Sequence, residues 1–181
     1  MNKRVVVIST SPRLGGNSDL LAEEFARGAT DAGNQVEKIT LAGKSIGFCR
    51  GCLACQNTRR CVISDDAGSI VEKMLTADVI AFATPIYYYE MSGQMKTMLD
   101  RSNPLFTADY AFRDIYMLST AAEDGAEVPE RAVSGLQGWI NCYEQARLAG
   151  TVFGGGVNER GEIRQHPEKL REAYELSLIH I

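Results

Sequence analysis

Short apolar runs rich in β-branched residues alternate with longer amphipathic stretches along this 181-residue chain, and this alternation restricts its fold more than any other feature. The first run, Val5–Ile8, is followed by a helical pattern, and the same order then repeats toward the end of the chain. Strands that are separated by helices run parallel, and a parallel sheet is covered by helices on both faces. The sequence therefore predicts an α/β fold with a doubly wound parallel sheet.

The bounds of the expected elements follow from where each pattern begins and ends. Strands are predicted over residues 4–9, 35–41, 78–84, 114–120 and 148–153. Helices are predicted over residues 17–32, 66–76, 93–101 and 129–145, with a last helix that begins near residue 167. Loops are predicted over residues 42–64 and 85–92. Because no repeat, low-complexity tract or linker divides this order, residues 1–175 are expected to form one domain.

The last six residues, Leu176 to Ile181, match the in-frame translation of the mosaic-end adapter of transposase sequencing libraries (CTGTCTCTTATACACATC). We therefore expect residues 176–181 to be a non-native tail and the native sequence to diverge after Glu175. The alternative is a genuine helix end. Under either interpretation His180 is not read as a functional residue.

Composition and charge exclude several classes of partner. The net charge is −4 at neutral pH, which gives no reason to expect a nucleic acid or an anionic membrane surface as partner. The apolar runs are too short to span a membrane, and the run after Lys3 and Arg4 is too short for a signal peptide. We therefore expect a cytoplasmic protein, whose five cysteines are thiols or ligands rather than structural disulfides.

The polar stretch Ser9–Ser18 lies between the first predicted strand and the first predicted helix. The first N–H groups of a helix have no partners within it, and the helix dipole is positive at this end, so the turn is a ready anion site. Hydroxyl, amide and guanidinium groups converge on it from Ser9, Thr10, Ser11, Arg13, Asn17 and Ser18. Gly15 and Gly16 allow the backbone to approach a ligand closely.

These features predict a socket for a phosphate monoester. Two other phosphate loops are excluded, because the stretch contains neither GxxxxGK[ST] nor GxGxxG. An ordinary polar turn, with Asn17 or Ser18 as the helix cap, is the alternative interpretation.

An aromatic run, Thr84-Pro85-Ile86-Tyr87-Tyr88-Tyr89, ends the third predicted strand. Such a run makes a flat, partly apolar wall that suits a ring system. In a doubly wound sheet the loops after the first, third and fourth strands meet outside the carboxyl ends of the strands. A phosphate socket beside a ring wall indicates a nucleotide-like ligand, whereas tyrosines that cover the sheet edge or an oligomer interface are the alternative.

The motif SPRxxGNS at residues 11–18, TPIYYY at residues 84–89 and the later Lys96…Leu99-Asp100-Arg101 resemble the NAD(P)H-dependent FMN reductases of the flavodoxin-like superfamily. The resemblance implies a five-stranded sheet in the order 2-1-3-4-5 and FMN as cofactor. It implies that the phosphate is held by Ser11, Arg13, Gly16, Asn17 and Ser18. The ring would lie along Pro85, Ile86, Tyr87 and Tyr88, with its pyrimidine edge near Ser119, Thr120 and Ala121. Lys96, Asp100 and Arg101 would serve packing or subunit contacts.

Four cysteines fall in one loop, as Cys49-x2-Cys52-x2-Cys55-x5-Cys61. Zinc sites usually have two pairs of ligands separated by a longer stretch, whereas a compact loop of this kind is more typical of an iron–sulfur cluster. The spacing resembles that of the iron–sulfur flavoproteins, a branch of the same superfamily, which implies a [4Fe–4S] cluster on these four residues. Redox-active or buried thiols without metal, and zinc, are the alternatives. Cys142, in a predicted helix, is expected to be an ordinary buried residue.

The resemblance implies an oxidoreductase in which NAD(P)H, or a reduced ferredoxin, supplies electrons to FMN. The acceptors would be a quinone, a nitro- or azo-aromatic compound, oxygen or a redox protein, and the assembly a homodimer or homotetramer. We name no catalytic residue, because hydride transfer is carried out by the cofactor. An electron carrier without a substrate of its own is the alternative, and a redox or metal sensor is a third possibility.

Overall fold

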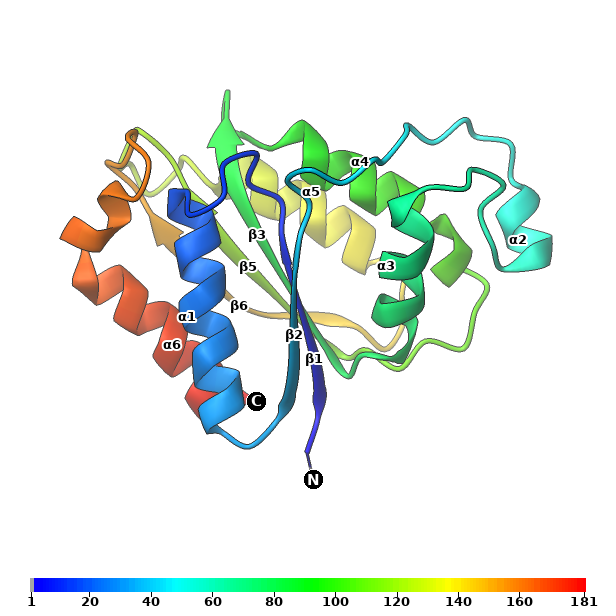
Figure 1. Ribbon diagram of the computed structural model, residues 1–181, viewed down its shortest axis with the longest axis horizontal. Coiled ribbons are helices and arrows are strands. Elements are labelled where there is room, and N and C mark those ends of the chain that lie inside the picture. Colours follow the sequence, from blue (N-terminus) through cyan, green and yellow to red (C-terminus); the bar gives the residue numbers. More distant parts are fainter. Residues whose placement is uncertain (1) are drawn as a thin grey trace.

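The computed structural model describes residues 2–181, which form an α/β fold (Figure 1). The strands are β1 Arg4–Ser9, β2 Gln35–Thr40, β3 Val79–Tyr87, β4 Glu90–Met91, β5 Asp114–Thr120 and β6 Arg147–Gly154. The α-helices are α1 Asn17–Asp31, α2 Ala54–Thr58, α3 Asp66–Thr76, α4 Gly93–Arg101, α5 Glu130–Ile140 and α6 Pro167–His180. Short 3-10 helices lie at Asn103–Leu105 and Glu162–Gln165. Within residues 2–181, no helix combines the length and the hydrophobicity that a membrane crossing requires.

Five strands form a parallel sheet in the order β2-β1-β3-β5-β6. This order is 2-1-3-4-5 once the two-residue β4 is set aside, since β4 pairs antiparallel with the end of β3. The predicted fold class and strand order are therefore confirmed. All five carboxyl ends lie at the same edge of the sheet, at the top of Figure 1.

Alternate residues of each strand point to opposite faces, so the two faces have separate cores. One core contains Val5, Val7, Leu118 and the helices α1 and α6. Position 28 of α1 requires glycine, because a Cβ there would lie 2.2 Å from the Tyr174 carbonyl oxygen of α6. The two helices therefore pack with their backbones close together, as Figure 1 shows.

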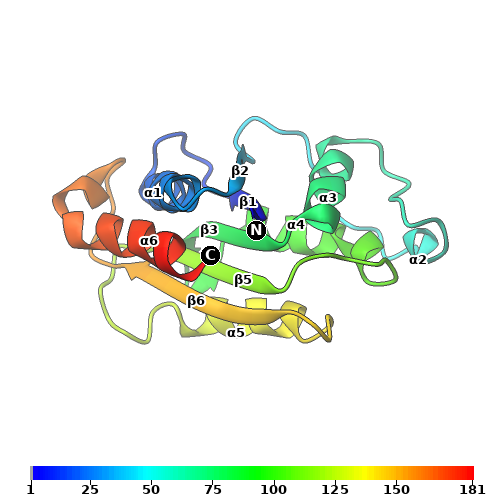
Figure 2. The ribbon, with the colours of Figure 1, turned by 90° about the horizontal axis from the view of Figure 1, so that it is seen from below.

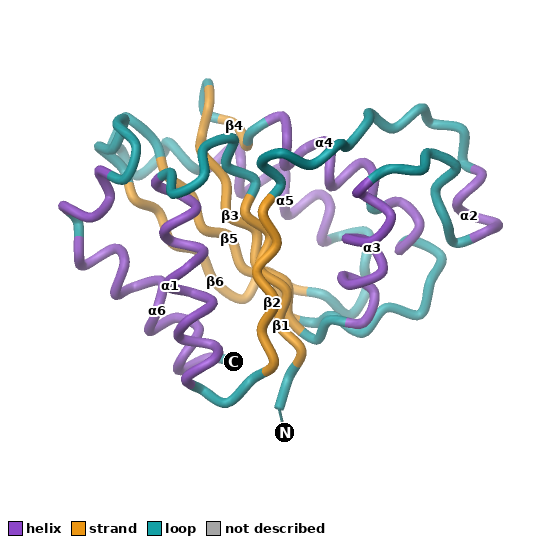
Figure 3. The backbone as a smooth tube through the Cα atoms, in the orientation of Figure 1, coloured by secondary structure: helices purple, strands orange, loops and turns teal. Residues whose placement is uncertain are grey.

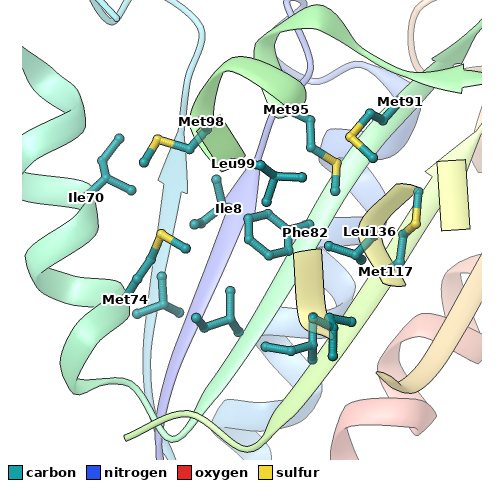
Figure 4. Packing of buried hydrophobic residues seen from close by; sticks show 14 of the residues in the cluster. Ile8, Ile70, Met74, Phe82, Met91, Met95, Met98, Leu99, Met117 and Leu136 are labelled. Carbon is teal, nitrogen blue, oxygen red and sulfur yellow. The ribbon is translucent and has the colours of Figure 1, made fainter. Parts of the chain in front are cut away.

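The other core is covered by α3, α4 and α5, which lie on the opposite side of the sheet from α1 and α6, to the right of the strands in the tube view (Figure 3). Phe82 of β3 lies at its centre, among methionine and leucine side chains from these helices (Figure 4). Methionine is unbranched and flexible, and it fills irregular gaps between helices and a twisted sheet. This core supports α4, whose first turn begins next to the end of β3.

Several element bounds differ from the prediction. Residues 85–87 were predicted to be loop, but they extend β3, which turns back through Tyr88 and Tyr89 into β4. The predicted helix over 129–145 ends at Ile140, with Asn141 as its C-terminal cap. The cysteine-rich loop contains the short helix α2, which lies between Leu53 and Arg59, two residues with positive φ. The helix over 93–101 has the predicted bounds.

The final helix runs through the segment expected to be adapter-derived. Ser177 is fully buried, and its hydroxyl lies where a Cβ of Gly28 would come within 2.3 Å. Any sequence of suitable pattern can continue a helix, so the origin of residues 176–181 stays a prediction.

Candidate functional site: a cleft at the carboxyl edge and a cysteine cavity

A cleft at the carboxyl edge of the sheet joins the segments that follow β1, β5 and β6 to the end of β3. It is lined by Ser11, Arg13, Gly16, Asn17, Ser18, Pro85, Ile86, Tyr87, Thr120, Ala121, Ala122, Val157 and Asn158. All the residues predicted to bind the cofactor are among them except Ser9, Tyr88 and Ser119. The structure therefore brings the predicted phosphate turn, the ring wall and the segment after the fourth parallel strand to one place.

The three exceptions have clear positions. Ser9 is fully buried beside the carboxyl of Asp19, below the turn. Ser119 is buried, and its hydroxyl donates to the Val152 carbonyl of β6 at 3.5 Å. Tyr88 is 97% exposed at the tip of the β3–β4 hairpin. None of the three side chains lines the cleft in this structure.

The turn between β1 and α1 is held by its own hydrogen bonds. The Ser11 hydroxyl donates to the Arg13 carbonyl at 2.9 Å and accepts the Arg13 N–H at 3.2 Å. Gly16 N–H donates to the same carbonyl at 3.0 Å. A Cβ on Gly16 would lie 2.8 Å from the Ser11 hydroxyl and 2.9 Å from the Arg13 carbonyl, so this position requires glycine. The turn is thus closed by contacts of its own.

Donors at the start of α1 remain free. The helix cap is Gly16, which offers no side chain, and no acceptor within residues 2–181 takes the N–H groups of Asn17 and Ser18. The Ser18 hydroxyl is buried without a hydrogen-bond partner in the described part of the chain. A buried polar atom left unpaired is rare, and here it lines the cleft. These donors and the positive end of the helix dipole match an anion.

The Asn17 side chain also has a structural role. Its side-chain amide donates to the Glu159 carbonyl at 2.9 Å, and its oxygen accepts the Ile163 N–H at 3.1 Å. The amide therefore helps to hold the segment after β6, while its second N–H and the backbone N–H of Asn17 have no acceptor in the described residues. Asn17 lines the cleft, and its predicted part in holding the phosphate stays a prediction.

The segment after β6 supplies cleft residues that the sequence analysis missed, namely Val157 and Asn158. Arg13 Nη1 donates to the Asn158 carbonyl at 3.1 Å, and Arg160 lies over the turn, 3.4 Å from where a Cβ of Gly15 would be. The available signal was the glycine run Gly154–Gly156 at the end of the last strand. Gly155 lets this chain pass close to Asp124, since a Cβ there would lie 2.5 Å from the Asp124 Cα.

Asp19 anchors the turn from below. Its carboxylate accepts the Gly15 N–H at 2.8 Å and pairs with Lys38 Nζ at 2.8 Å. Burial opposes the charged form, but hydrogen bonds from donors around the carboxyl, first among them Lys38, outweigh it and lower the pKa of Asp19 below its ordinary value. Lys38 also offsets a negative charge that would otherwise repel an anion in the turn.

The β3–β4 hairpin forms one wall of the cleft. Its two turn residues, Tyr88 and Tyr89, have φ of 50° and 65°, a region that bulky side chains rarely adopt. The Tyr89 hydroxyl donates to Glu123 at 2.7 Å, which fixes the hairpin to the segment after β5 and raises the pKa of Tyr89. Strain of this kind persists only where the surroundings impose the conformation, and it clusters at functional sites.

The cysteines line a second cavity, of about 450 Å³, at the other end of the molecule. Cys49, Cys52, Cys55 and Cys61 all border it, together with apolar side chains that include Leu99, Phe106 and Trp139. Asn103 Nδ2 donates to Cys55 Sγ at 3.1 Å. Cys142 borders the same cavity and is exposed, which corrects the expectation that it is buried.

Two interactions hold together the two ends of the cysteine loop, which we call its neck. Asp65 caps α3 by accepting the Ala67 N–H, and it also accepts the Gly47 N–H at 2.8 Å. Arg101 of α4 pairs with both oxygens of Asp65, at 2.6 and 2.8 Å. This hydrogen-bonded pair holds the pKa of Asp65 below its ordinary value. Within residues 2–181 no three potential ligands are grouped as around a single metal ion.

Comparison with known proteins shows a family. The sequence model described as NADPH-dependent FMN reductase matches residues 3–153. An iron-sulfur flavoprotein of Methanocaldococcus jannaschii is 40% identical over 102 residues, which are 56% of this chain and 53% of that protein. An iron-sulfur flavoprotein of Methanosarcina thermophila is 26% identical over 157 residues, which are 85% of this chain and 81% of that protein. The match to the first relative thus spans about half of its length.

Solved structures agree on the fold. An NAD(P)H:quinone oxidoreductase from Methanothermobacter marburgensis has a TM-score of 0.76 at 16% identity, covering 98% of this chain and 96% of that one. An azoreductase from Bacillus anthracis has a TM-score of 0.71 at 15% identity, covering 98% of this chain and 99% of that one. At such identities the likeness shows the fold alone.

Proposed function

The chain belongs to the NADPH-dependent FMN reductase family, and from this premise we propose that it is an FMN-dependent oxidoreductase that takes electrons from NAD(P)H. We propose a quinone, a nitro- or azo-aromatic compound or a redox protein as the acceptor. The names of a quinone oxidoreductase and an azoreductase among the structural relatives, and of iron-sulfur flavoproteins among the sequence relatives, support these classes.

The observation that best supports FMN binding is the set of free hydrogen-bond donors at the start of α1. The buried Ser18 hydroxyl and the N–H groups of Asn17 and Ser18 point to a bound anion that uses them. Gly16 lets the turn fold tightly onto Ser11 and Arg13 beside these donors. The residues present therefore fit the phosphate of FMN, with Arg13 supplying the charge.

The rest of the cleft fits the ring. Pro85, Ile86 and Tyr87 form an extended, largely apolar wall, and Thr120 and Ala121 line the neighbouring side. Bound FMN supplies the chemistry of hydride and electron acceptance. Arg13 is the only charged side chain that lines the cleft in the described residues, and the hydride chemistry is left to the cofactor rather than to the chain. Its part is to hold the ring, admit a flat donor or acceptor and limit water.

We also propose that Cys49, Cys52, Cys55 and Cys61 hold a [4Fe–4S] cluster. A cubane takes each thiolate on a different iron, so its four ligands surround one space, and the four thiols that border a single cavity support this proposal. The apolar side chains of the cavity would shield the cluster. Lys44, Arg50, Arg59 and Arg60 are exposed around the loop and would offset its negative charge.

The test of the flavin assignment is binding and turnover. Titration of the flavin-free chain with FMN should saturate at about one FMN per chain, and riboflavin, which lacks the phosphate, should bind much more weakly. With FMN bound, NAD(P)H should be oxidised steadily when a quinone is added. Equal affinity for the two flavins would place the phosphate elsewhere. Flavin binding without steady turnover on any small acceptor would favour an electron carrier.

We propose a homodimer or homotetramer as the working assembly, on the strength of the family resemblance. Light scattering on the FMN-bound chain measures this directly. A monomeric mass at micromolar concentration would contradict it.

A further inference from the structure

Arg101 is the largest side chain that is fully buried in the molecule. Buried arginine is rare, because the guanidinium must find partners for all its donors. It lies at the end of α4, on the face toward the cysteine loop rather than in the flavin cleft. Neither the flavin cleft nor the four thiols require such a residue, so its presence needs an explanation.

The contacts of Arg101 bring together the two ends of the cysteine loop. Nη1 donates to the Gly47 carbonyl at 2.7 Å, on the chain that enters the loop. Nη2 donates to the Ile63 carbonyl at 3.3 Å, on the chain that leaves it. The fork pairs at the same time with both oxygens of Asp65. One side chain therefore closes the neck of the loop.

One donor of the guanidinium is left over. The Nε–H group is buried and has no hydrogen-bond partner in the described residues. The Cys61 side chain is also a neighbour of the guanidinium and, after Asp65, helps to raise the pKa of Arg101. Cys61 also borders the cysteine cavity. The unpaired donor thus belongs to a guanidinium that has one of the four thiols as a neighbour.

We propose that Arg101 is a positioning residue of the cysteine site: it holds the neck of the loop closed through Asp65 and donates its Nε–H to the sulfur of Cys61. The proposal rests on the cysteine site of the proposed function. Arginine is required, because lysine carries the same charge but cannot pair with Asp65 as a fork and serve a third acceptor as well. Hydrogen bonds to ligand sulfurs help to set the reduction potential of a cluster.

The test compares Arg101→Lys with Arg147→Lys. Arg147 also pairs with an aspartate, Asp114, but it is exposed and belongs to β6, away from the loop. Two quantities are measured: the midpoint potential of the anaerobically reconstituted cluster, and the alkylation rate of Cys55 in the iron-free chain relative to the exposed Cys142. Cys55 is buried, so its alkylation reports opening of the loop.

We expect Arg101→Lys to alkylate Cys55 several-fold faster and to shift the potential to more negative values, with FMN binding unchanged. Arg147→Lys should behave as the wild type in all three measurements. Wild-type rates and potential in Arg101→Lys would overturn the proposal. Faster alkylation with an unchanged potential would overturn the hydrogen bond to Cys61.

If Arg101→Lys fails to fold, Asp65→Asn replaces it, since this variant keeps the shape of the partner and weakens the fork. If the wild-type chain takes up no iron, the cluster of the proposed function is contradicted, and the Cys55 alkylation alone decides the inference. An unchanged rate then overturns it, and a faster rate supports it.

Discussion

The turn before α1 and the cysteine loop are both candidate cofactor sites, but they are built differently. The turn is closed by hydrogen bonds within Ser11–Gly16 and anchored below by Asp19. The cysteine loop is tied mainly at its neck, and several of its residues, including Cys49 and Phe48, are exposed. Figures 1 and 2 place α2, within this loop, at the opposite end of the molecule from α6.

This difference in hydrogen bonding and exposure indicates how each site obtains its shape. The turn is part of the sheet edge, so folding alone sets its free donors and a ligand can bind a prepared surface. The cysteine loop contributes little to either core, and its interior is a cavity rather than packed side chains. A bound group that links four thiols would complete it, because metal binding and local folding are coupled in such loops. The two sites should therefore fail independently.

The largest expected effect is the loss of one cofactor without the loss of the other. Cys49→Ser should abolish retention of a cluster while FMN binding stays at the wild-type level, because the serine removes one thiolate ligand at one end of the molecule only. Iron and sulfide assays and flavin absorbance measure the two outcomes on one sample. Cys142→Ser is the matched control, since Cys142 borders the cavity outside the four-cysteine motif. Loss of FMN from Cys49→Ser would show that the sites depend on each other.

A smaller effect is expected for Arg13→Ala. It removes a charge-assisted contact to phosphate, which is worth on the order of 1.5–3 kcal/mol, so the dissociation constant for FMN should rise by about 10- to 150-fold. Fluorescence titration with FMN measures it. Arg147→Ala serves as the control, because it removes an exposed arginine at the start of β6. Unchanged affinity in Arg13→Ala would mean that the phosphate lies away from the turn.

Gly16→Ala tests whether the turn is prepared in advance. The new Cβ would meet the Ser11 hydroxyl and the Arg13 carbonyl at less than 3 Å, and overpacking of this kind costs about 1–3 kcal/mol. FMN affinity should fall and the thermal midpoint should drop. Gly68→Ala is the control, because a Cβ there meets nothing within 4 Å and alanine favours the helix. Equal behaviour of the two variants would contradict a rigid turn.

The pH dependence of stability tests the anchor below the turn. Asp19 has a lowered pKa in the folded state, so the unfolded chain binds more protons there and the stabilisation is present above the ordinary pKa of 3.8 for this carboxyl. It is lost as the pH falls through the folded pKa. Asp19→Asn should therefore show a shallower loss of unfolding free energy below about pH 4, measured by urea titration at several pH values. A slope equal to that of the wild type, or of the exposed Asp109→Asn, would contradict this.

The smallest effect concerns the hairpin. Tyr88→Asn should raise the free energy of unfolding by up to about 1 kcal/mol, since asparagine tolerates positive φ better than tyrosine. Urea unfolding measures it. Tyr88→Ala removes the same ring without that tolerance and should give no gain. If both variants are stabilised, the gain comes from removal of the exposed ring, and relief of backbone strain is contradicted.

The fold was predictable because its signals are local. The bounds of β1, α4 and β5 follow from apolar runs and polar caps within a few residues of each end. The extension of β3 was missed because a two-residue turn usually carries Asn-Gly, whereas here it carries two tyrosines. The early end of α5 was missed because Tyr143 is buried against Tyr110 and Phe112, a contact across the fold.

The site, like the fold, was predictable where its signals lie close together in the sequence. Residues on the turn and the aromatic run could be named, since each motif carries its chemistry in consecutive positions. The role of the Asn17 amide and the contribution of Asn158 depend on contacts more than 140 positions apart in the sequence, and no local pattern reports them. The burial of Arg101 is likewise a property of how α4 packs against the neck of the loop.

The most direct test of the two-site account is an anaerobic purification followed by an absorption spectrum with flavin, iron and sulfide assays. The account predicts about one FMN with about four iron and four sulfide per chain. FMN without iron would support the assignment of the cleft to FMN and contradict the assignment of a cluster to the cysteine loop. A chain that contains neither cofactor, and that binds no FMN when it is added in excess, would contradict the account.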